Sequence, residues 1–101
     1  MLVEFSIVPM GVGESVSKEV AKVIDIIDRS GLNYRTHAMG TIIEGDWEQC
    51  LALIKQCHDA VRAAAPRVYT RIAIDDRAGG KSTMDRKLKS VREKLGREFK
   101  E

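Results

Sequence analysis

The chain has 101 residues, of which 44% are hydrophobic and 32% are charged, and its formal net charge at pH 7 is +2. This length suits a single domain over residues 1–101, and the balance of apolar and charged residues excludes a disordered chain. The small net charge gives no indication of nucleic-acid binding. Neither a signal peptide nor an apolar run near the ~20 residues of a membrane span is visible. Cys50 and Cys57 fall seven residues apart on one predicted helix, too far apart for a disulfide, so we expect a protein of the reducing cytoplasm.

The first two predicted elements are a strand and a helix. Residues 2–9 alternate in polarity, which predicts a half-buried strand. A helix should follow, beginning at Ser15 or Ser17 and stopping at Gly31, because glycine suits a left-handed cap. Its apolar residues recur at the helical period: Val16, Val20, Val23, Ile24 and Ile27.

Residues 33–47 predict two short strands joined by a two-residue loop at Met39-Gly40. Gly40 would supply the positive φ that a tight hairpin needs. This loop would place three pairs of residues opposite one another: Ala38 and Thr41, Thr36 and Ile43, Tyr34 and Gly45. Because side chains alternate along a strand, these residues would share the covered face of the sheet. The open face would then carry Arg35, His37, Ile42 and Glu44.

A second helix should begin at a capping box formed by Asp46 and Gln49 and end at Ala65, because residue 66 is proline. Trp47, its first residue, is expected to belong to the core. The predicted apolar stripe of this helix consists of Trp47, Cys50, Leu51, Ile54, Cys57, His58 and Val61. The strand that follows, residues 67–75, should turn four side chains inward: Val68, Thr70, Ile72 and Ile74.

The last helix should open at Ser82 or Thr83. Its apolar stripe is narrow, which is typical of a seam for another helix, and consists of Met84, Leu88, Val91, Leu95 and Phe99. The order β-α-β-β-α-β-α predicts an α+β, ferredoxin-like sandwich with a four-stranded antiparallel sheet and an added C-terminal helix. Two helices would cover one face of that sheet and leave the other to solvent or to a partner.

One segment is similar to a phosphate-binding loop. Residues 75–82 lie between a predicted strand and a helix and end in Gly80-Lys81-Ser82, but Asp75 stands where such a loop needs glycine. We therefore do not predict nucleotide hydrolysis. Loose anion binding around residues 79–82 at the start of the helix remains open.

Other chemistry-bearing residues favour a structural role. Three potential metal ligands share the apolar stripe of one helix and lack the usual metal-site spacing, so no metal site is predicted: Cys50, Cys57 and His58. An enzyme would need an acid–base pair, for which the sequence offers Glu4 and Glu44. No nucleophile is tied to a histidine by spacing, and we expect a protein without catalytic residues.

The open sheet face is the predicted functional surface. Carboxylates, a hydroxyl, a histidine and an aromatic ring on one rigid surface could hold a small polar ring. The candidate ligand-binding residues are Glu4, Ser6, His37, Glu44, Tyr69 and Arg71. The alternative is an ordinary solvated sheet face or a polar interface between subunits.

The chain resembles the family of small thiamine-binding proteins. The resemblance covers nearly the whole chain, in order, through Glu4-Phe5-Ser6-Ile7-Val8-Pro9, Ser15-Val16-Ser17, Ser30-Gly31-Leu32-Asn33-Tyr34, Met39-Gly40-Thr41-Ile42-Ile43-Glu44-Gly45, Cys57-His58, Arg67-Val68 and Ile74-Asp75-Asp76-Arg77. One departure is Ala38, where the family often has proline. The resemblance implies a ferredoxin-like fold assembled as a dimer of dimers through sheets and terminal helices. It also implies binding of thiamine, or of its hydroxymethylpyrimidine part, without catalysis.

The implied ligand matches the chemistry of the open face. An aminopyrimidine offers a donor and ring acceptors, which suit Glu44, Ser6 and His37, whereas a cationic thiazolium suits Glu4 and an aromatic ring. Arg71 could orient a glutamate or repel a cation. We therefore expect a homo-oligomeric binding protein with no metal or further cofactor, its site near a subunit interface. The alternatives are an oligomeric regulatory or assembly module and a pyrimidine-processing enzyme.

Overall fold

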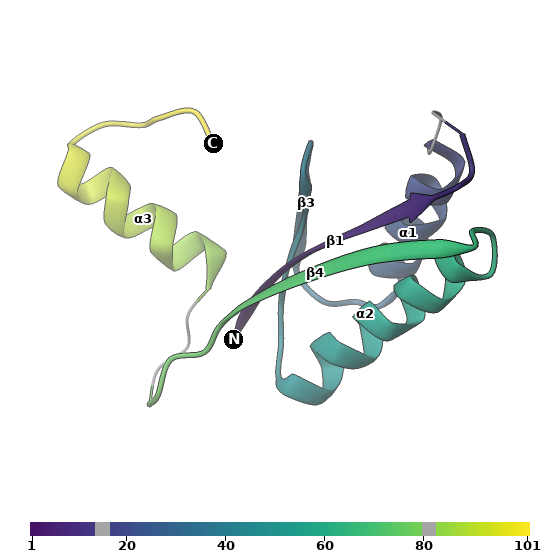
Figure 1. The fold of residues 1–101 in the computed structure, drawn as a ribbon. Helices are drawn as coiled ribbons and strands as arrows, with labels where there is room; N and C mark the ends of the chain where they lie inside the picture. Colours follow the sequence, from purple (N-terminus) through teal and green to yellow (C-terminus); the bar gives the residue numbers. More distant parts are fainter. Residues whose placement is uncertain (14–16, 80–82) are drawn as a thin grey trace.

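The structure is a computed structural model that describes residues 1–13, 17–79 and 83–101. Its elements run in the predicted order (Figure 1): β1 Leu2–Met10, α1 Ser17–Arg29, β2 Tyr34–His37, β3 Gly40–Glu44, α2 Trp47–Arg62, β4 Arg67–Asp75 and α3 Met84–Leu95. Three features considered in the sequence lie outside the described residues: Ser15, the predicted stripe residue Val16, and Gly80-Lys81-Ser82. The architecture is the α+β, ferredoxin-like fold expected from the element order.

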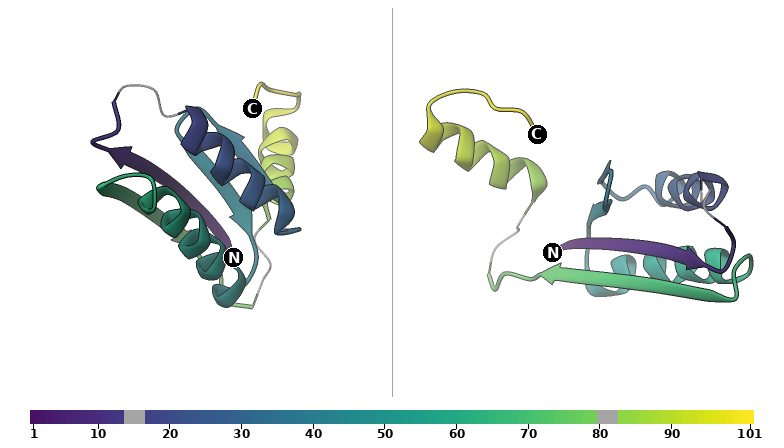
Figure 2. Two further views of the ribbon diagram at one scale, coloured as in Figure 1. Left: turned by 90° about the vertical axis from the view of Figure 1, so that its right-hand side faces the viewer. Right: turned by 45° about the horizontal axis from the view of Figure 1, so that its top comes forward.

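The four strands form one antiparallel sheet in the order β2-β3-β1-β4. Helices α1 and α2 cover one face, while α3 lies on the other side of the sheet (Figure 2). The core between the sheet and its two helices consists of Val3, Phe5, Ile27, Ile43, Cys50, Leu53, Ile54 and Cys57. Burial of this apolar surface, at about 25 cal/mol per Å², is the main source of stability.

The pairing register of β2 on β3 is shifted by two residues from the predicted register. Its loop is Ala38-Met39, and β2 pairs Thr36 with Thr41. Gly40 does not adopt positive φ; it is the first residue of β3, and a Cβ added to it would lie 2.7 Å from the carbonyl oxygen of Phe5. The glycine is therefore needed for close approach between strands and not for the turn. Because the shift is two residues, every side chain keeps its predicted face.

The helix ends follow local hydrogen bonding. Gly31 has the predicted left-handed conformation after α1, with φ +77°. Helix α2 ends at Arg62 and not at Ala65, because the chain tightens there: the amide of Ala64 donates to the carbonyl of Val61, and the Arg62 guanidinium donates to the carbonyl of Ala65 at 3.0 Å. Thr83 caps α3, whose end at Gly96 leaves the predicted stripe residue Phe99 beyond the helix.

Predictions of burial were wrong on three elements. Val20 of α1 is 46% exposed and Leu51 of α2 is 39% exposed, although both lie in the predicted apolar stripes. Trp47 is 52% exposed, because burial along α2 begins one turn later at Cys50. On β4, Ile72 and Ile74 are 46% and 40% exposed although they lie on the covered side. β4 is an edge strand, so only one neighbouring strand and part of one helix shelter these two side chains.

The capping box at the start of α2 offers a test of how much local hydrogen bonding contributes to stability. Asp46 Oδ1 accepts the amide of Gln49 at 2.8 Å, and Gln49 Oε1 accepts the amide of Asp46 at 3.2 Å. We expect Asp46→Ala to lower the free energy of unfolding by about 1 kcal/mol, measured by urea denaturation. Asp46→Asn keeps an acceptor oxygen and should cost less. Equal stability of Asp46→Ala and the natural protein would contradict a stabilising cap.

Candidate functional site

The strand register arranges the open face in transverse rows. One row runs across all four strands and consists of His37, Gly40, Ser6 and Arg71. The next row consists of Arg35, Ile42, Glu4 and Ala73. A third, nearest α3, consists of Glu44, Leu2 and Asp75. Five of the six predicted site residues stand in these rows, and the sixth, Tyr69, pairs with Val8 in a further row of the same face, as the alternation of the strands requires.

A shallow hollow of about 280 Å³ brings four of the six candidates together. They are Glu4, Ser6, His37 and Arg71. Gly40 contributes no side chain to the row between His37 and Ser6, which leaves the backbone there uncovered. Tyr69 lies one row beyond the hollow, opposite Val8, and is 51% exposed. Glu44 lies at the opposite end of the face, beside α3.

The histidine of the hollow is held in a defined orientation. His37 Nε2 lies 3.1 Å from Glu4 Oε2, and His37 Nδ1 accepts the amide of Met39 at 3.2 Å. Because Nδ1 is an acceptor, the neutral ring carries its proton on Nε2 and donates it to the carboxylate. Glu4 retains further acceptor capacity, since a carboxylate has two oxygens and its side chain is 54% exposed.

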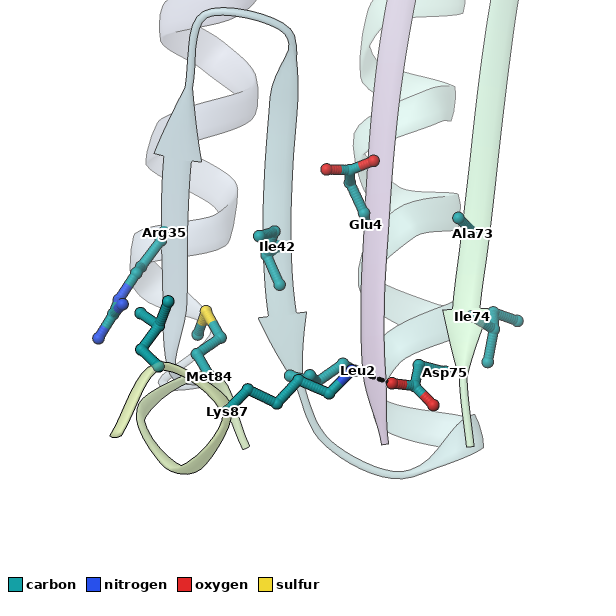
Figure 3. Close-up of a pocket in the computed structure, with 10 residues that line it drawn as sticks. Leu2, Glu4, Arg35, Ile42, Ala73, Ile74, Asp75, Met84 and Lys87 are labelled. Carbon is teal, nitrogen blue, oxygen red and sulfur yellow. Dashed lines mark hydrogen bonds and ion pairs between the residues drawn. The ribbon is translucent and has the colours of Figure 1, made fainter. Parts of the chain in front are cut away.

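A second, more apolar cleft of about 420 Å³ adjoins the hollow where α3 meets the sheet (Figure 3). Leu2 and Ile42 form its floor, and Met84 of α3 forms its wall. Leu88 of the same helix also lines the cleft. Lys87 bonds to Asp75 across the cleft mouth, and this hydrogen bond lowers the pKa of the Asp75 carboxyl. Glu4 borders both spaces, so the hollow and the cleft form one continuous surface.

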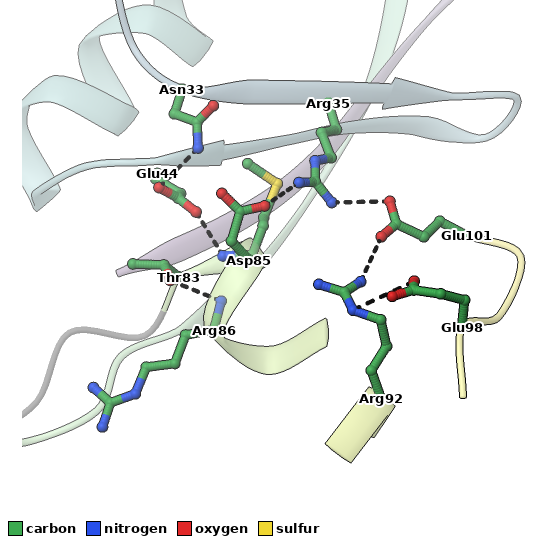
Figure 4. Close-up of polar contacts among 10 residues, drawn as sticks. Asn33, Arg35, Glu44, Thr83, Asp85, Arg86, Arg92, Glu98 and Glu101 are labelled. Atoms are coloured by element: carbon green, nitrogen blue, oxygen red, sulfur yellow. Dashed lines mark hydrogen bonds and ion pairs between the residues drawn. The ribbon is translucent and has the colours of Figure 1, made fainter. Parts of the chain in front are cut away.

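Glu44 has a structural role that the sequence did not reveal. Its Oε1 accepts the amide of Met84, the first residue of α3, at 2.5 Å, and its Oε2 accepts the side-chain amide of Asn33 at 3.1 Å (Figure 4). A carboxylate at a helix start is favourable because the first amides lack partners within the helix. Its predicted ligand contact remains a prediction, but both oxygens of the Glu44 carboxylate already accept hydrogen bonds here, one from Met84 and one from Asn33.

Ion pairs attach α3 and the C-terminal tail to β2. Arg35 bonds to Asp85 of α3 and, at 3.3 Å, to Glu101 of the C-terminal tail. Glu101 also accepts from Arg92 at 3.1 Å, so the tail is tied to both the sheet and the helix (Figure 4). These residues were absent from the predicted site. The sequence showed only that many charged residues surround the narrow apolar stripe of the last helix. That pattern does not indicate which partner, 50 or more residues away, each charged residue binds.

The cysteines have no role in the candidate site. Cys50 and Cys57 are fully buried, and burial raises the pKa of the Cys57 thiol to about 11. A protonated, inaccessible thiol is a poor nucleophile and a poor metal ligand. His58 Nδ1 lies 2.6 Å from the Thr70 hydroxyl, which satisfies the histidine on the covered face. Among the described residues no group of three potential ligands could hold a metal ion.

The fold and this surface define an α+β sandwich with an open sheet face partly enclosed by a C-terminal helix. A sequence profile described as thiamine-binding protein matches residues 3–92. A UPF0045 protein of Synechocystis sp. is 42% identical over 92 residues, covering 90% of this chain and 76% of that protein. The chain belongs to the thiamine-binding protein family.

Solved structures agree with this assignment. The UPF0045 protein of Methanocaldococcus jannaschii is 40% identical over 93 residues, which is 92% of this chain and 93% of that protein. Its crystal structure has a TM-score of 0.84, covering 91% of this chain and 95% of that one. A Thermotoga maritima protein, proposed to act in thiamine biosynthesis or salvage, shares the fold at 23% identity and a TM-score of 0.78, covering 90% and 97% of the two chains. Within the described residues, no helix is long and apolar enough to cross a membrane.

The contact between Glu44 and α3 predicts how the cleft wall is held. In Glu44→Ala the amide of Met84 loses its acceptor, so we expect faster hydrogen exchange across the first turn of α3, by roughly fivefold for a loss of about 1 kcal/mol. Glu44→Gln keeps an oxygen at the same place and should exchange more slowly than Glu44→Ala. Unchanged exchange in Glu44→Ala would show that this bond does not hold the helix.

Proposed function

We propose that this protein is a non-enzymatic, cytoplasmic binding protein for thiamine or its hydroxymethylpyrimidine part, with the ligand on the open sheet face. The observation that carries the proposal is the hollow in which Glu4, Ser6, His37 and Arg71 converge beside an apolar cleft. The family description and the assignment of the Thermotoga maritima protein to thiamine metabolism support the choice of ligand.

The chemistry of the hollow suits the two rings. The amino group of the pyrimidine can donate to the free acceptor positions of Glu4, while Ile42 and Leu2 offer an apolar floor for ring faces. A thiazolium cation gains from the negative charge of Glu4, which His37 orients by a hydrogen bond. An acid–base mechanism has weaker support, because Glu44 is engaged at the start of α3 and lies outside the hollow.

A second copy of the chain would complete the site. Ligand sites generally bury 70–90% of their ligand, and an open sheet face with a shallow hollow covers only one side. The monomer also leaves apolar surface uncovered, with Val91 and Leu95 of α3 50% and 46% exposed. Its radius of gyration is 15.2 Å, against about 13 Å for a compact domain of this length, because α3 projects beyond the end of the sheet to which it is bonded. Subunit contact through α3 and the edge strand would bury these surfaces and exclude water from the ligand.

The same exposed surfaces favour a second candidate function. An oligomeric regulatory or assembly module would use the α3 stripe and the edge of β4 for subunit contacts alone. Such a protein would assemble without saturable binding of either compound. Ligand titration therefore separates the two functions.

Calorimetric titration with thiamine and with hydroxymethylpyrimidine tests the first proposal. We expect saturable binding at about one ligand per chain. Glu4→Gln should weaken thiamine roughly tenfold, the effect of losing one charged hydrogen bond, and should weaken the neutral pyrimidine less. Glu93→Gln, which makes the same change on an exposed part of α3, is the matched control and should bind normally. Absence of heat with both compounds, from a folded protein, would leave the assembly module as the better reading.

Light scattering after size exclusion tests the subunit contact. We expect the natural protein to run as a dimer or tetramer, and Val91→Glu to shift it toward the monomer, because an unpaired carboxylate within an apolar contact is costly. Ser90→Glu adds the same charge at the neighbouring position outside the stripe and should keep the natural assembly. A monomeric natural protein at high concentration would rule out this contact.

A further inference from the structure

Nearly every charged side chain lining the two spaces on the open face is already paired. Glu4 bonds to His37, and Asp75 to Lys87. Arg35 bonds to Asp85 and Glu101. Arg71 is the exception: among the described residues no hydrogen bond or ion pair involves its guanidinium. Within the part of the chain that the structure describes, the lining thus presents one unpaired charge, and it is positive.

Arg71 has a hydroxyl directly opposite. The register between β1 and β4 pairs it with Ser6, which places the two Cβ atoms about 5 Å apart on the same face. The Ser6 hydroxyl likewise has no hydrogen-bond partner among the described residues. Both side chains line the hollow, and Gly40 on the other side of Ser6 places no side chain over it. The pair is a set of unused donors at one end of the polar row.

A guanidinium fork beside a hydroxyl matches the oxygens of a phosphate. Arginine binds phosphate through two parallel hydrogen bonds, and a serine hydroxyl can donate a third. The same group is unfavourable for a bare thiazolium, because like charges repel. The negative Glu4 lies in the neighbouring row and is oriented by His37, so the hollow carries opposite charges at two separate places.

From these observations we propose that Arg71 and Ser6 form a phosphate subsite, so that the protein prefers a phosphate monoester of its pyrimidine-containing ligand over the free alcohol. The proposal rests on the ligand site proposed above. Glu4 then receives the amino or cationic end of the ligand, and Arg71 receives the phosphate. A molecule with a positive ring and a phosphate, such as thiamine monophosphate, is complementary to both ends.

Titration with thiamine, thiamine monophosphate and inorganic phosphate tests this subsite. We expect the monophosphate to bind roughly tenfold tighter than thiamine, the effect of one added charge-assisted hydrogen bond. Arg71→Gln should abolish that advantage, so that this variant binds the monophosphate no tighter than it binds thiamine. Arg71→Lys, which keeps the charge but loses the fork, should retain part of the advantage.

Arg67 supplies a matched control for general electrostatics. It lies at the start of β4, on the same face of the sheet, but outside the hollow. Arg67→Gln removes the same charge and should leave the preference for the monophosphate intact. If Arg71→Gln and Arg67→Gln lost the preference for the monophosphate equally, the preference would come from the overall positive charge of the face. That result would overturn the subsite.

The remaining outcomes separate the subsite from the proposed function. Equal binding of thiamine and its monophosphate would overturn the subsite and leave the ligand site standing. Inorganic phosphate binding as tightly as the monophosphate would reveal an anion site unconnected to the pyrimidine and would overturn the proposal. No binding of any of the three compounds to the folded, oligomeric protein would overturn both the subsite and the ligand site. Circular dichroism of each variant establishes that it is folded.

Discussion

The pairing of β1 with both of its neighbours is the constraint on which this protein depends. β1 is a central strand, and each of its side chains either enters the core or stands in one row of the open face. Val3 and Phe5 anchor the covered side, which obliges Glu4 and Ser6 to point the other way. The polar surface is thus a geometric consequence of burying the apolar one. A slip of one residue would exchange the two faces, and the burial of Val3 and Phe5 opposes it.

The polar groups of the open face divide into those that hold α3 and those that keep unused hydrogen-bonding capacity. Glu44, Arg35, Asp75 and Lys87 hold α3 against the end of the sheet. These contacts are half exposed, so each contributes little alone, but together they orient the helix that walls the apolar cleft. Farther from α3, the polar side chains of the open face make fewer hydrogen bonds and ion pairs. Among the described residues, the donors of Ser6 and Arg71 have no partners, and this is the basis of the ligand site proposed above.

The hairpin shows why some features could be predicted and others could not. Alternation alone assigned each residue to its face, and the assignment survived although the loop lies at Ala38-Met39 and not at Met39-Gly40. The true register depends on Gly40 approaching the carbonyl of Phe5, a contact between residues 35 positions apart. Similar reasoning applies to Trp47 and Ile72. Their helical or strand spacing indicated burial, but the spacing carries no information on where the covering elements stop.

The sequence alone predicted the element order, the ferredoxin-like topology and the caps at Asp46 and Gly31. It also predicted that all six candidate residues lie on the open face. These features depend on local hydrogen bonding and on the periodicity of apolar residues, and both involve residues that are close together in the sequence. Only the tertiary structure decided that Glu44 holds α3 and that four candidates share one hollow. It also decided that, within the described part of the chain, Arg71 is the one charged residue of the hollow without a partner. Such properties depend on distances between residues far apart in sequence, and no local pattern encodes them.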